Sequence, residues 1–249
     1  MDAHDTLTTP FRAHLEHCRE LGIPAQLSEC ADYIQNIDIL VSEFLESYYM
    51  VERLWDPESP NSSEASGDEM ILEPFYESFE FALVDPESKR AGESVVCVSG
   101  ALGPLPSDQH PALSRRGLDF VGLRAGEAQH IVLGATQSSK TESVFVLLLR
   151  ALNGLAELSP PLRMAKLGSD VLQGGIPENA DFSLCLGISE REDDADANAL
   201  LELTRDLAEG FFARTEGIAQ FSGTFSQVTC FEFDEDSFAL GRFETVWQV

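Results

Sequence analysis

Residues 118–158 restrict the possible folds more than any other stretch of this sequence. Two short apolar runs, residues 118–123 and 130–137, have the length and composition of β-strands and are separated by a turn at 124–127. A strongly apolar run then extends from Ser143 to Leu158, and its length favours a helix. This part of the chain therefore predicts two successive strands followed by an apolar helix.

The flanking sequence extends this pattern into an α/β fold with a central mixed sheet flanked by helices. Helical spacing of apolar residues predicts helices over residues 6–21 and 28–55, the second opening at Ser28 as N-cap. Further strands are expected at 79–84, 94–98, 182–188 and 228–233, with a helix capped by Asn198 and an edge strand or irregular cover in the tail 238–249. Strands that alternate with helices in the second half indicate βαβ crossovers.

The domain organisation follows from the absence of a break in this pattern. The sequence has no internal repeat and no clean linker. We therefore expect a single domain over residues 1–249, with N-terminal helices at 6–55 and the sheet with its crossover helices at 71–249.

The charge of the chain argues against nucleic acid as a partner. Among 249 residues there are 43 acids and 16 bases, a net charge of −27. Nucleic-acid binding draws most of its affinity from Lys and Arg on phosphates, and such a charge opposes the approach of a polyanion. The acidity has two interpretations: a soluble or salt-adapted surface, or a surface that binds a basic protein. We expect no nucleic-acid partner.

The cysteines and the hydropathy pattern predict a soluble cytoplasmic protein. The five cysteines are widely spaced and form no Cys-x-x-Cys pair. The N-terminus is acidic and lacks the apolar run of a signal peptide, and no stretch reaches the ~18 apolar residues that a membrane span needs. We expect reduced thiols and no membrane association.

The order helix, antiparallel strands, helix, strand resembles the PD-(D/E)XK nuclease-like superfamily, with a restriction-endonuclease-like arrangement. The runs Leu118–Gly122 and Ile131–Gln137 carry the resemblance, within residues 30–190 at most. It implies that acids on two adjacent strands bind magnesium and that a nearby Lys positions the attacking water. Phosphodiester cleavage needs such hard oxygen ligands and a cation near the developing charge.

The residues at the corresponding positions match that pattern only in part. Asp119 stands where the first metal-binding acid is expected, but Ala135 occupies the position of the second acid and Gln137 that of the Lys. Glu43 or Glu46 on an N-terminal helix is a substitute carboxylate, as some members of the superfamily use. If the chain is a nuclease, Asp119 binds Mg²⁺ and Asp119, Gln137 and Glu43 are the catalytic residues. The alternative is a purely structural role, in which Asp119 marks the start of one strand and Gln137 the end of the next.

Two other motifs have weaker chemical interpretations. His14, His17 and Cys18 share a helix face, and with Cys30 they have the residue types that bind zinc. An amphipathic helix with surface imidazoles explains the same spacing. The run Gly134–Thr141 ends in Lys-Thr between a strand and a helix, but it lacks the second glycine of a phosphate-binding loop.

Taken together, the residues favour a catalytically degenerate nuclease-like scaffold that acts by binding another protein, without a cofactor. Two alternatives stay open. One is an Mg²⁺-dependent nuclease that uses Asp119. The other is an acidic mimic of DNA that occupies a basic protein, which would present carboxylates in rows.

Overall fold

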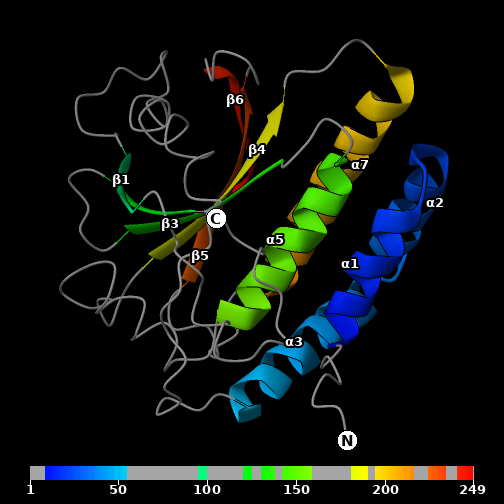
Figure 1. Cartoon of the computed structure of the whole chain (residues 1–249), viewed down its shortest axis with the longest axis horizontal. Coiled ribbons are helices and arrows are strands. Elements are labelled where there is room, and N and C mark those ends of the chain that lie inside the picture. The colour runs from blue at the N-terminus through cyan, green and yellow to red at the C-terminus, as the bar shows by residue number, and fades with distance from the viewer. Residues whose placement is uncertain are drawn as a thin grey trace, which may run out of the picture.

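In a computed structural model, the chain combines a six-stranded sheet with helices that lie on one side of it (Figure 1). The structure describes residues 9–54, 95–99, 120–124, 130–137, 142–158, 181–189, 194–215, 224–233 and 240–248. The described helices are α1 (Pro10–Glu20), α2 (Ile23–Gln35), α3 (Ile37–Leu54), α5 (Val144–Leu158) and α7 (Ala195–Thr215). The strands are β1 (Val95–Ser99), β2 (Phe120–Arg124), β3 (His130–Thr136), β4 (Asp181–Ser189), β5 (Thr224–Phe233) and β6 (Leu240–Gln248).

The sheet is mixed, as the sequence predicts. Its strands follow the chain order from β1 to β6. The pairs β1–β2 and β2–β3 are antiparallel, β3–β4 and β4–β5 are parallel, and β6 adds to β5 as an antiparallel strand. The helices α5 and α7 connect the parallel neighbours. Both crossovers step across the sheet in the same direction, and the fixed hand of such crossovers puts both helices on one face.

Helix α5 lies in the middle of the described structure. It packs on β3 and β4 on one side and on α1 and α3 on the other, while α2 packs on α7 (Figure 1). Every residue from Ser143 to Ala156 is buried. A helix that is covered all round is expected to be mostly apolar, and the buried polar side chains within α5 are those of Arg150 and Asn153.

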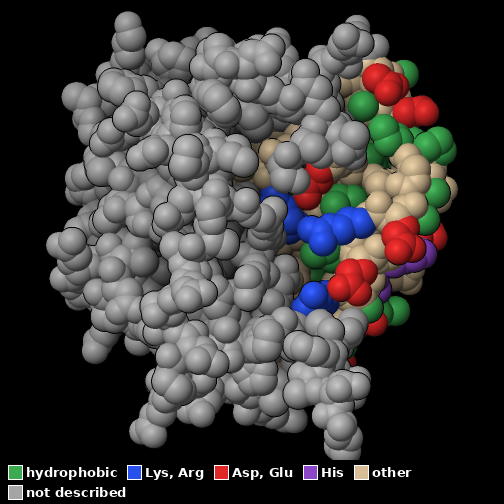
Figure 2. Space-filling view, viewed as in Figure 1, with side chains coloured by type: hydrophobic (Ala, Val, Ile, Leu, Met, Phe, Trp, Pro, Cys, Tyr) green, Lys and Arg blue, Asp and Glu red, His purple; other side chains and the backbone are tan. Residues whose placement is uncertain are grey.

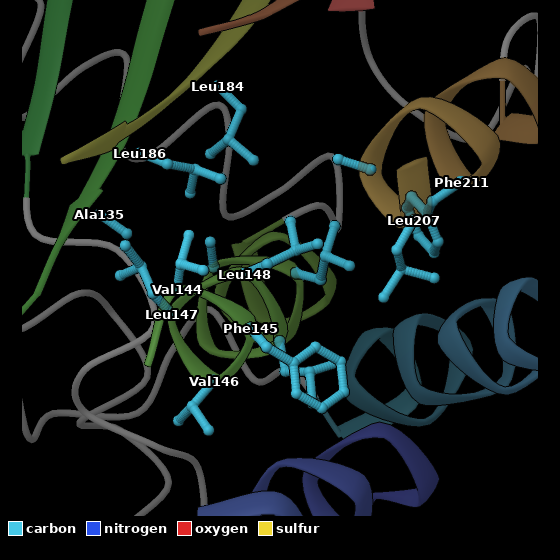
Figure 3. Packing of buried hydrophobic residues seen from close by; sticks show 14 of the residues in the cluster. Ala135, Val144, Phe145, Val146, Leu147, Leu148, Leu184, Leu186, Leu207 and Phe211 are labelled. Atoms are coloured by element: carbon cyan, nitrogen blue, oxygen red, sulfur yellow. The ribbon is translucent and has the colours of Figure 1, made fainter. Parts of the chain in front are cut away.

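The sheet face beneath α5 is built from rows of apolar side chains in register. Leu133 pairs with Leu184, and Leu184 with Val228. One step along the strands, Ala135 pairs with Leu186. Figure 3 shows Ala135, Leu184 and Leu186 pointing toward Val144, Leu147 and Leu148 of α5. The alternation of side chains along a strand thus places one apolar face against the helix.

The predicted helix over residues 28–55 is wrong, because the structure has two helices there. Helix α2 begins at Ile23, with Pro24 in its first turn, where a missing N–H costs nothing. The chain leaves helical geometry at Asn36, with φ −112° and ψ 32°, and the Asn36 amide donates to the Asp32 carbonyl over 2.9 Å. Helix α3 then starts at Ile37 in a new direction. The apolar spacing runs through this break, so the sequence pattern alone does not reveal it.

The start of α7 is also displaced from the prediction. Asn198 was expected to cap this helix, but it lies inside the helix and its N–H donates to the Asp194 carbonyl over 2.9 Å. The Asp194 carboxylate accepts from the N–H of Asp196 over 3.0 Å and so occupies the cap. The other described elements lie where they were predicted, to within a few residues, and the tail forms an edge strand, β6. The strand expected at 79–84 lies outside the described residues.

Candidate functional site

Ala135, one of the positions compared with the nuclease pattern, is buried in the apolar core. Ala135, at the position of the second metal-binding acid, has no exposed surface. Its neighbours in the apolar cluster include Leu186 and Leu147 (Figure 3). A carboxylate at this place would be desolvated between the sheet and α5. Asp119, the first expected acid, lies outside the described residues.

Gln137, at the position of the usual Lys, holds the end of β3 in place. Its side chain is buried. Its backbone N–H donates to the Gly187 carbonyl over 2.9 Å, and its side-chain amide donates to the Glu142 carbonyl. The amide thus ties the end of the strand to the residue that precedes α5 by two positions. This geometry gives Gln137 a clear structural task.

A buried ion pair lies beside Gln137. The Arg150 Nε donates to Glu142 Oε1 over 3.1 Å, and the side chains are only 4% and 8% exposed. Arg150 Nη2 also donates to Glu142 Oε2 over 3.4 Å and to the Thr136 carbonyl. The guanidinium therefore joins α5 to the end of β3. The sequence contained a sign of this pair, because Arg150 is the single charged residue in the run 144–156.

The N-terminal helices are fastened to the same corner. Ser143 caps α5, since its Oγ accepts from the N–H of Val146 over 3.2 Å. The same hydroxyl donates to Gln26 Oε1 of α2 over 2.5 Å. The Gln26 amide nitrogen in turn donates to the carbonyls of Cys18, over 3.1 Å, and Leu21, over 2.8 Å. The end of α1, the start of α2, the start of α5 and the end of β3 therefore meet here. We call this corner, with Gln26, Gln137, Glu142, Ser143 and Arg150, the α5 junction.

Glu43, the expected helix carboxylate, belongs to a different polar group, the Glu43–His14–Tyr33 chain. Glu43 Oε2 lies 2.5 Å from His14 Nε2, and His14 Nδ1 lies 2.7 Å from the Tyr33 hydroxyl. Burial raises the pKa of Tyr33, and the nearby Cys18 adds to that shift. The phenol therefore keeps its proton and is able to donate a hydrogen bond to Nδ1 when the His14 ring proton is on Nε2, facing Glu43.

The Glu43–His14–Tyr33 chain links three helices, and only its end at Glu43 and His14 reaches solvent. His14 comes from α1, Tyr33 from α2 and Glu43 from α3, and the His14 and Glu43 side chains are 25% and 32% exposed. Tyr33 is buried, with its ring 5.9 Å from that of Phe145 in α5. The carboxylate–imidazole–hydroxyl order is that of a nucleophile activated by a base. The hydroxyl, however, is enclosed by α1, α2 and α5, so the chain is best explained as a clamp between helices.

The zinc hypothesis does not gain support from the described side chains. His14 uses both ring nitrogens in the chain above, and His17 is exposed. Burial raises the pKa of the Cys18 thiol to about 11 and that of Cys30 to about 12, so neither is a ready thiolate ligand. Within the described ranges, no group of three or more His, Cys, Asp or Glu residues is placed to hold a metal ion.

Two of the nuclease candidates belong to different polar groups: Gln137 to the α5 junction and Glu43 to the Glu43–His14–Tyr33 chain. The third, Asp119, lies outside the described residues. Comparisons with protein-family models, with curated proteins and with solved structures returned no match for this chain. In the part of the chain that is described, no helix combines the length and the apolar character needed to cross a bilayer.

Proposed function

We propose that this protein is a non-catalytic, nuclease-like scaffold that acts by binding a basic partner protein. The order of elements supports the scaffold: a helix, α3, precedes the antiparallel strands β1 to β3, and α5 and the parallel strand β4 follow. The proposed loss of catalysis rests on the burial of Ala135. It is fully buried against α5, at the position where a nuclease of this type would hold a metal ligand in water.

The exposed side of α7 supports a basic partner. Glu202, Asp206 and Glu209 are exposed at i, i+4 and i+7 spacing, which puts them on one face of the helix. Along the helix axis their Cα atoms are about 6 and 4.5 Å apart. Glu202 pairs with Arg205, whereas Asp206 and Glu209 form no ion pair with the described residues. A row of carboxylates of this kind attracts a lysine- or arginine-rich surface and speeds its association.

The loss of catalysis is tested by incubating the pure protein with plasmid and single-stranded substrates in Mg²⁺ and in Mn²⁺. We expect no cleavage above that of Asp119→Ala, which serves as the control for a contaminating nuclease. Cleavage that Asp119→Ala abolishes would establish the alternative, an active metal-dependent nuclease.

Binding is tested with a fluorescent lysine-rich peptide, by anisotropy at physiological salt. The double variant Asp206→Asn/Glu209→Gln should bind more weakly than the matched control Glu20→Gln/Glu46→Gln, which removes two exposed charges from other helices. Equal weakening in both variants would mean that total charge, and not the α7 row, attracts the peptide. Duplex DNA added with a basic DNA-binding protein tests the mimic alternative, because a mimic competes with DNA for that protein.

A further inference from the structure

His14 is the member of the Glu43–His14–Tyr33 chain that can change its charge near neutral pH. Histidine is the side chain that ordinarily gains or loses a proton between pH 5 and 8. The His14 side chain is 25% exposed, so it can exchange a proton with solvent. Both of its ring nitrogens face a partner, Glu43 Oε2 at 2.5 Å and the Tyr33 hydroxyl at 2.7 Å. A proton gained here therefore acts on the contacts of α1 with α2 and with α3 at once.

The titratable groups that face His14 come from three helices. Helix α3 contributes the Glu43 carboxylate, and α2 contributes the Tyr33 hydroxyl. Cys18 lies on α1 itself, with its Sγ 3.7 Å from the Tyr33 hydroxyl. Burial, Cys18 and the Glu29 carboxylate all raise the pKa of Tyr33, so the phenol stays neutral over the range in which an imidazole titrates. The charge that directly faces the imidazole is thus that of a carboxylate. Figure 2 shows a histidine side chain beside carboxylates on the described surface.

The hydrogen bonds of the chain can accommodate either protonation state of His14. In the neutral state with the ring proton on Nε2, Nδ1 accepts from the Tyr33 hydroxyl. In the charged state Nδ1 takes up one proton from solvent and becomes a donor, and the Tyr33 oxygen can accept from it. The Tyr33 proton must then turn away from Nδ1, and Cys18 Sγ is a weak acceptor within reach. No other covalent bond to hydrogen has to break.

We propose that this chain is a pH-sensitive clamp, which holds α1 to α3 more firmly when His14 is protonated. The bond from Nε2 to Glu43 then joins two full charges, and such bonds are stronger than neutral ones. The gain is modest, because both side chains are partly exposed. It requires a charged imidazole and an ionised carboxylate together. It is therefore lost as the pH rises and His14 gives up its proton, and again in strong acid, where Glu43 takes one up.

The position of α1 gives this clamp its importance. Helix α1 packs on α5 as well as on α3. Its buried Phe11 ring lies 5.6 Å from that of Phe44 in α3 and 6.5 Å from that of Phe211 in α7. A firmer α1–α3 contact therefore supports the aromatic packing of the helical layer. This inference concerns neither the α7 row nor the nuclease-like positions, so it stands or fails apart from the proposed function.

The experiment compares melting temperatures at pH 8 and pH 5.5. The variants are His14→Gln, which keeps a polar side chain but cannot gain a proton, and the control His17→Gln, which removes an exposed histidine of the same helix. Because the many acids change the stability of every variant with pH, the measured quantity is the difference from the wild type at each pH. For His14→Gln this difference should widen by about 1–4 °C at pH 5.5. For His17→Gln it should stay constant. A difference for His14→Gln that is the same at both pH values would overturn the proposal.

Glu43→Gln supplies a second variant, and NMR supplies a readout that does not depend on unfolding. In the Glu43→Gln background, replacement of His14 by Gln should no longer have a cost that depends on pH. In the wild type, nitrogen-15 shifts of labelled His14 should show the proton on Nε2 at pH 8. As His14 becomes charged, the carbon-13 shift of Tyr33 Cζ should change with the same midpoint, because the hydroxyl reverses from donor to acceptor. A Tyr33 signal that does not follow His14, or a proton found on Nδ1 at pH 8, would contradict the proposed exchange.

Discussion

Gln26 and Ser143 are 117 positions apart in the chain, yet the Ser143 hydroxyl donates a hydrogen bond to the Gln26 side chain over 2.5 Å. The same Ser143 oxygen caps α5, and the same Gln26 amide binds the last carbonyls of α1. The capping of the central helix is therefore coupled to the docking of the N-terminal helices. A change at either residue should be felt by both.

Replacement of Gln26 by Ala tests this coupling. The substitution removes the hydrogen bonds that Gln26 makes with the Ser143 hydroxyl and with the Cys18 and Leu21 carbonyls, which should lower the free energy of unfolding by about 2–3 kcal/mol. Gln35→Ala, at an exposed position of the same helix, is the matched control and should change stability by less than about 0.5 kcal/mol. Urea unfolding followed by circular dichroism measures both. Equal effects would show that Gln26 does not join the two parts of the fold.

The Glu142–Arg150 pair should be far more sensitive than a surface pair. Glu142→Gln leaves the buried Arg150 guanidinium without its counter-charge, at an expected cost of about 3–5 kcal/mol. Glu202→Gln breaks the exposed pair with Arg205 and should cost at most about 1 kcal/mol. The double variant Glu142→Gln/Arg150→Met should regain part of the loss, since it removes the uncompensated charge. Denaturant melts of the wild type, Glu142→Gln, Arg150→Met and the double variant give the coupling energy of the pair, and additive costs would contradict the assignment.

Gly210→Ala should stabilise the protein by about 0.5–1 kcal/mol, because alanine is the better residue inside a helix. Gly210 lies within α7, and an added methyl group would lie 3.7 Å from Ile37 Cδ1, an ordinary contact distance. Gly22→Ala is the natural control. Gly22 is the N-cap of α2, where glycine is preferred to alanine, so that change should give no gain. A loss of stability in Gly210→Ala would show that α3 and α7 pack more tightly there than the distances indicate.

The buried thiols predict a loss of stability in alkaline solution. The pKa of Cys18 is raised to about 11 and that of Cys30 to about 12, from an ordinary 9.0. The unfolded chain releases these protons at lower pH than the folded one, so the stabilisation is complete below pH 9 and falls as the pH rises toward 11 and 12. Unfolding measured between pH 7 and 10.5 should show this decline, with a shallower slope in Cys30→Ala. An unchanged slope would mean that another group titrates.

The fold could be predicted from the sequence wherever the local sequence pattern and the tertiary packing agree. The run after Ser143 has a cap and an unbroken apolar sequence, and the helix begins within one residue of the prediction. The break at Asn36 was missed because the apolar spacing of α2 and α3 continues across it. The residues around Ala135 show the same limit in a different form. A strand pattern reveals which residues share a face, but it does not show that this face is covered by α5.

The polar groups were harder to predict, because their partners are distant in the sequence. Glu43 and His14 were both candidates, one for a nuclease and the other for zinc, and the structure joins them to each other across 29 positions. Periodicity places each side chain on a helix face but leaves the neighbouring helix unknown. Arg150, in contrast, was detectable from the sequence as the single charged residue in the run 144–156.

The position of α5 between two layers also governs the order in which the protein can be assembled during its synthesis. Helix α3 ends at Leu54, and the ribosome must add the residues up to Val144 before the first turn of α5 exists. Until then the apolar side chains of α1 and α3, among them Phe11 and Phe44, lack the surface that covers them in the native fold. The nascent chain thus exposes apolar helix surfaces through much of translation. Chaperones protect such surfaces from aggregation during this period.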